Sequence, residues 1–169
     1  ASIDGNVAQL DDLAANSTSA TCAFTIVVDD VATVTQGKTI IDATSAGTVD
    51  FSAAGLTGAL ATYIGTDVNT VHTSLTAIKN KDTDVNVIVT PAITTITADQ
   101  VTQINNIAAA TTGTVTATIS GDHDTQSALS TEGTDVLTIT ISDAITTDEF
   151  AALDAKTVGN ITLTAGLSD

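Results

Sequence analysis

Short stretches in which hydrophobic and polar residues alternate recur along the chain and predict a series of β-strands. In residues 114–119, 137–141 and 161–164, aliphatic residues or alanine alternate with threonine. Such alternation is typical of a strand with one buried face and one solvated face. A sheet covered on both faces would need nearly continuous hydrophobic strands. We therefore expect helices on one face of the sheet and an exposed, threonine-rich surface on the other.

Three segments follow one plan, at residues 24–58, 85–121 and 137–169. Each has an alternating strand, a turn, a helical stretch, a glycine and a second strand. A Thr-x-x-Gln/Glu capping box stands at each helix start, at residues 33–36, 97–100 and 146–149. The glycines at 47, 113 and 159 are predicted to end each helix in the left-handed conformation. The first helical stretch contains Gly37, so a short turn or loop is an alternative there.

Further helices are predicted between these segments, at residues 6–15, 69–79 and 124–130. Strand starts near 24, 48, 85, 114, 137 and 161 are separated by 24, 37, 29, 23 and 24 residues, and the longest interval leaves room for an extra turn. Strand–helix–strand links of this length favour parallel crossovers. We therefore predict an α/β repeat solenoid over residues 1–169. It would be a single array of short parallel β-strands alternating with short helices on one face, similar in layout to a leucine-rich-repeat array.

The chain is strongly acidic, with 20 Asp and Glu residues against four lysines and a net charge of −16. Without a basic stripe we expect no nucleic acid partner and no binding to an anionic membrane surface. No hydrophobic run approaches the roughly 18 residues of a membrane span, so we expect no membrane insertion. Cys22 is the single cysteine, which excludes an internal disulfide and predicts a buried thiol, with an intermolecular bridge as the alternative. An initiator methionine and a signal peptide are missing, so we expect a processed chain or part of a longer one.

Two groups of aspartates are candidate metal ligands, and no motif of catalytic residues is found. Asp82 and Asp84 stand at alternating positions like the start of a calcium-binding loop, but the glycine and glutamate of that loop are missing. Asp122 and Asp124 flank His123, and the alternative interpretation is a turn with a helix cap. We predict no cofactor, with a structural calcium ion as the alternative.

The threonines of the exposed strand face form a candidate binding surface. They are Thr114, Thr116, Thr118, Thr138, Thr140, Thr162 and Thr164. Rows of outward threonines can order water or ice. Threonine is also the polar residue best suited to an exposed strand, and this second interpretation needs no ligand.

Several stretches resemble repeats of a known kind of protein. These are SDAITTDEFAALDAKTVGNITLTAGLSD, TPAITTITADQVTQINNIAAATTGTVTATISG and GTVDFSAAGLTG. They resemble repeats of very large surface or secreted proteins of marine cyanobacteria, and similar repeats in structural proteins of the phages that infect them. The resemblance implies an extracellular structural, adhesive or motility-associated role, and it carries no catalytic residues to transfer.

The sequence therefore predicts a non-enzymatic structural or adhesive segment of an extracellular or cell-surface protein, fibre or filament. We expect the chain to open on a helix and close on a strand, leaving uncapped layers. These layers would stack head-to-tail on neighbouring repeats or identical copies. The alternatives are a phage fibre or decoration protein located in the virion, a calcium- or ice-binding solenoid, and a secreted enzyme.

Overall fold

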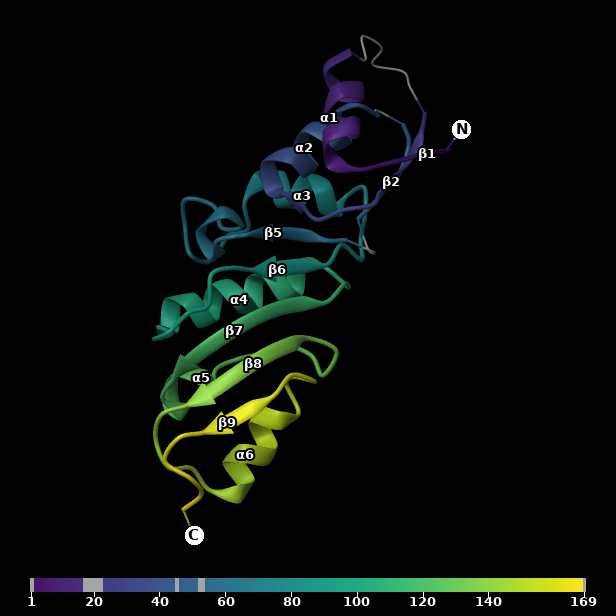
Figure 1. The fold of residues 1–169 in the computed structure, drawn as a ribbon. Coiled ribbons are helices and arrows are strands. Elements are labelled where there is room, and N and C mark those ends of the chain that lie inside the picture. The colour runs from purple at the N-terminus through teal and green to yellow at the C-terminus, as the bar shows by residue number, and fades with distance from the viewer. Residues whose placement is uncertain (1, 17–22, 45, 52–53, 169) are drawn as a thin grey trace.

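The computed structural model describes residues 2–16, 23–44, 46–51 and 54–168 (Figure 1). Cys22 lies outside the described residues. The elements in chain order are β1 (Ser2–Gly5), α1 (Val7–Asn16), β2 (Thr25–Val28), β3 (Ala32–Thr33), α2 (Val34–Asp42), β4 (Val49–Asp50), β5 (Leu56–Gly58), the 3-10 turn η1 (Leu60–Thr62), α3 (Thr73–Lys79), β6 (Val87–Val89), α4 (Ala98–Ala110), β7 (Val115–Gly121), α5 (His123–Gln126), β8 (Val136–Ile141), α6 (Thr147–Asp154) and β9 (Ile161–Leu163).

The strands form two sheets in which every neighbouring pair of strands is parallel. One sheet has the order β1-β2-β4, and the other has the order β3-β5-β6-β7-β8-β9. Within each sheet the strands are ordered in space as they are in the chain. Successive strands therefore lie side by side from the N-terminal to the C-terminal end (Figure 1). The predicted α/β class with parallel strands is confirmed.

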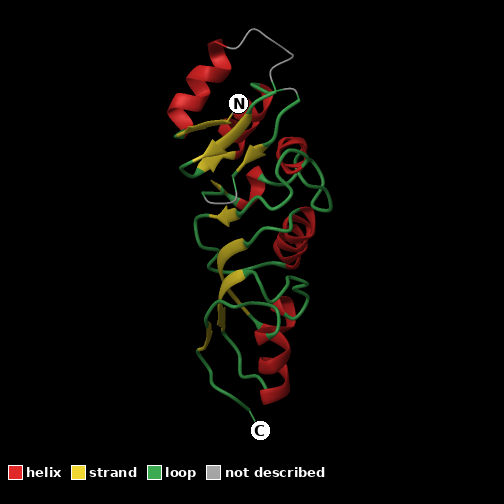
Figure 2. Ribbon diagram, turned by 90° about the vertical axis from the view of Figure 1, so that its right-hand side faces the viewer, coloured by secondary structure: helices red, strands yellow, loops and turns green. Residues whose placement is uncertain are grey.

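The helices of the C-terminal two thirds lie on one side of the strands (Figure 2). At the N-terminal end α1 contacts α2, and α2 contacts α3. The chain passes from the smaller sheet to the larger one between β2 and β3, which follow each other directly in the sequence. The same division separates β4 from β5.

The inward positions of paired strands carry aliphatic residues that are fully buried. Leu56 pairs with Val87, Val87 with Val115, and Ile119 with Ile139, and all five have no exposed surface. Each strand adds one aliphatic layer to a continuous core. Small β-branched residues suit these thin layers, which explains a folded chain with only 2% aromatic residues.

The three predicted capping boxes are all formed. In α2, α4 and α6 the N-cap threonine accepts from the backbone of the third helical residue, whose side chain accepts in return from the threonine backbone. Helix α2 has nine residues in spite of Gly37, so the alternative of a loop is wrong. Gly37 is buried, and a Cβ there would lie 3.0 Å from side-chain atoms of Ile78 and Leu56. The glycine lets neighbouring side chains pack against the helix.

The predicted role of the three glycines after the helices is wrong. Among the described residues, only Gly55 and Gly166 have a positive φ. At Gly47, Gly113 and Gly159 a Cβ would instead overlap a backbone carbonyl oxygen of an earlier chain segment. The three oxygens belong to Phe24, Asp84 and Leu137, respectively. These glycines are needed because two backbone segments approach closely, and a left-handed turn is not involved.

Other boundaries also differ from the prediction. The first described element is β1, so the expectation of a chain that opens on a helix is wrong; the alternation in β1 is too short to stand out. Helix α3 begins at Thr73, after an antiparallel bridge between Ile64 and Val71. Helix α5 is a single turn of four residues. The expected extra turn in the longest interval is η1, followed by the buried Tyr63.

Candidate functional site

Paired threonine side chains lie on the outer face of β7, β8 and β9, over a short part of the sheet. Thr118 pairs with Thr138, so one row of hydroxyl groups crosses β7 and β8; Thr140 pairs with Ser120 and Thr162, so a second row crosses β7, β8 and β9. These side chains are half-buried or exposed. The next outward row holds Thr57, Ile88, Thr116 and Val136, so two aliphatic residues interrupt it.

Two of the seven predicted face threonines lie outside the strands. Thr114 precedes β7, and its backbone nitrogen donates to the side chain of Asn86 at 2.7 Å. Thr164 follows β9, and its hydroxyl donates to the backbone oxygen of Ile141 at 2.9 Å. Their positions in the alternating pattern suggested outward strand side chains, but β7 begins after Thr114 and β9 ends before Thr164.

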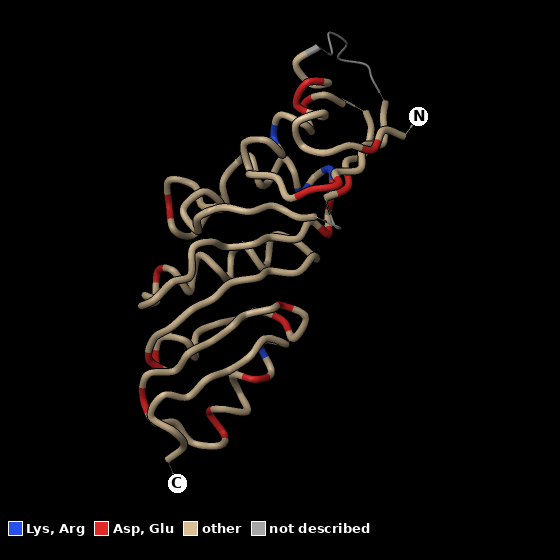
Figure 3. Tube along the Cα trace, viewed as in Figure 1, with Lys and Arg blue, Asp and Glu red and all other residues tan. Residues whose placement is uncertain are grey.

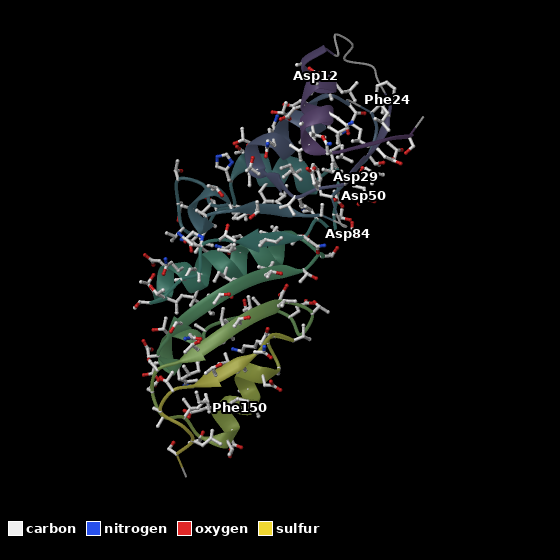
Figure 4. All side chains as sticks on the ribbon, in the orientation of Figure 1. Asp12, Phe24, Asp29, Asp50, Asp84 and Phe150 are labelled. Carbon is white, nitrogen blue, oxygen red and sulfur yellow. The ribbon has the colours of Figure 1, made fainter. Side chains whose placement is uncertain are left out.

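Asp82 joins the segment before β6 to the residue that follows β4. Its side chain is 6% exposed, and Oδ2 accepts from the backbone nitrogen of Phe51 at 2.6 Å. Burial raises the pKa of the Asp82 carboxyl to about 6, and a side-chain hydrogen bond with Asp84 and the charges of Asp84 and Asp50 also raise it. The bond from Phe51 acts in the opposite direction and lowers the pKa. Asp29, Asp50 and Asp84 lie along the same edge of the molecule (Figure 4).

Asp122 and Asp124 lie at the other ends of the strands and serve the start of α5. Asp122 is the N-cap residue, accepting from the backbone nitrogen of Thr125 at 2.7 Å and from its hydroxyl at 3.1 Å. These bonds to the ionised form hold the pKa of Asp122 below its usual range. Asp124 is exposed in the first helical turn. The alternative interpretation of this motif, a capped turn, describes the contacts.

His123 sits beside the capping box of α6. Its Nδ1 lies 3.8 Å from Oε1 of Glu149, and its backbone nitrogen donates to Asp143 at 2.8 Å. Glu149 is held mainly by the backbone and hydroxyl of Thr146, and these bonds lower its pKa. The other histidine, His72, caps α3 by accepting from the backbone nitrogen of Ser74.

The two aspartate pairs are not brought together. Among the described residues, no three His, Cys, Asp or Glu side chains are grouped so that they could hold a metal ion. Acidic residues lie mostly at the turns around the strand ends and in the helices (Figure 3). The four lysines lie in helices or two residues after one.

Three threonines missed by the sequence analysis form a recurring contact, which we call the threonine latch: Thr44, Thr111 and Thr157. Each lies one to three residues after a helix, and each hydroxyl donates to a backbone oxygen one layer earlier in the chain, at Phe24, Val85 or Leu137. Each also accepts from the backbone nitrogen of the nearby glycine, Gly47, Gly113 or Gly159. A signal was present, since a threonine precedes each of these glycines by two or three residues.

The segment between β5 and α3 borders two shallow hollows. One, of about 410 Å³, lies between η1 and the turn that contains Pro91 and Ile93. The other, of about 450 Å³, is lined by Ile64, Val71, His72 and nearby threonines. His72 is the one titratable residue lining either hollow.

No family model matches the sequence, and neither a curated protein nor a solved structure is significantly similar to it. Among the described residues, every helix is too short or too polar to cross a membrane.

Proposed function

We propose that this chain is a non-enzymatic structural or adhesive segment of an extracellular surface protein, fibre or filament, built as an α/β solenoid. The observation that carries the proposal is the sequential parallel ladder from β5 to β9, in which each strand pairs with the next one along the chain. In such a ladder each layer contacts mainly its neighbours, so the molecule can be extended without changing its design.

A recurring set of contacts between layers supports the proposal. The threonine latch joins successive passes at three places. Carboxylates do the same at four others: Asp30 accepts from Val7, Asp82 from Phe51, Asp135 from Val115, and Asp143 from His123. Every one of these bonds crosses from one pass of the chain to the preceding one. The same kind of contact therefore recurs between successive layers, as expected of a repeat architecture.

The use of the polar side chains also favours a structural role. Asp122, Glu149 and His72 cap helices, and Asp82 and Asp135 accept from the backbone nitrogens of Phe51 and Val115. A catalytic acid or base needs a polar atom directed at a substrate. These five side chains instead accept hydrogen bonds from the backbone.

An in-register deletion tests the solenoid. Ala117 pairs with Leu137, so removal of residues 117–136 joins two strands without a change of register. An equally long deletion of residues 107–126 breaks the register and is the matched control. We expect the first variant to fold cooperatively with a lower urea midpoint and the second to unfold. If both unfold alike, the layers are not exchangeable and the proposal is wrong.

The location of the protein tests the role. Antibodies against the chain should label the surface of intact source cells. Labelling confined to virus particles would support the alternative of a phage fibre or decoration protein, and labelling only after cell lysis would contradict both.

A further inference from the structure

We draw no further inference here: the strongest candidate, the outer sheet face of β7, β8 and β9 with its paired threonine side chains, carries none, because nothing in the described residues shows which ligand or partner covers it.

Discussion

The hydroxyl group of Thr157 should contribute more to the stability of this protein than any hydroxyl on the outer sheet face. Thr157 is buried, and its hydroxyl accepts from the backbone nitrogens of Leu137 at 2.7 Å and Gly159 at 2.8 Å. It also lies 3.0 Å from the carbonyl oxygens of Asp135 and Leu137, and its single proton is donated to one or shared between the two. One oxygen atom therefore connects the last helix-to-strand loop to the preceding strand.

The substitution Thr157→Val removes these bonds while keeping the shape of the side chain. The backbone nitrogen of Leu137 is then left without its acceptor in a fully buried place, and that of Gly159 in a half-buried one. A buried donor without a partner costs about 1–3 kcal/mol. We therefore expect the free energy of unfolding to fall by about 2–4 kcal/mol, with Gly159 contributing the smaller part.

Urea denaturation followed by circular dichroism measures this loss. Thr157→Ser keeps the hydroxyl and should lose much less, since only a methyl group is removed. Thr118→Val, at an exposed strand position, should change stability by less than about 0.5 kcal/mol. The latch would be refuted as a stabilising contact if Thr157→Val were no more destabilised than Thr118→Val.

Three further changes test other parts of the fold. Gly159→Ala places a Cβ against the backbone oxygen of Leu137 and should lower the urea midpoint by an amount corresponding to about 1–3 kcal/mol; an unchanged midpoint would mean that the two segments can separate without loss. Thr146→Ala removes the N-cap of α6 and should cost about 1 kcal/mol by thermal melting, an effect that Thr147→Ala, one position later, should not reproduce. Because the folded-state pKa of Asp82 is about 6 against an ordinary value of 3.8, the folded protein holds this proton more tightly than the unfolded chain. The contribution of Asp82 to stability should therefore be greatest below about pH 4 and decline as the pH rises through 6. Asp82→Asn should flatten this part of the stability–pH curve, and a curve identical to that of the wild type would contradict the assignment.

The features that were predicted correctly depend on residues close together in the sequence. The capping boxes at Thr33, Thr97 and Thr146 join residues three positions apart, so their geometry follows once a helix begins there. The alternating strands likewise specify which side chains turn inward.

The features that were missed depend on contacts between distant segments. Helix α2 forms in spite of Gly37 because Leu56 and Ile78 pack against the glycine. Asp82 was a candidate calcium ligand from its spacing, yet its partner, Phe51, stands 31 residues away. No pattern within a short window contains either contact.

The sequence by itself determined the parallel α/β class, the starts of the helices and the alternation of aliphatic and threonine faces, because local hydrogen bonding and side-chain period act within a few residues. The tertiary structure alone decided the division into two sheets and the role of the glycines. It also decided which acids and threonines form hydrogen bonds to the backbone of a neighbouring layer. Whether a carboxylate caps a backbone amide or remains in solvent depends on which backbone lies opposite it. That neighbour is one layer away in space and twenty or more residues away along the chain, as with Asp135 and Val115.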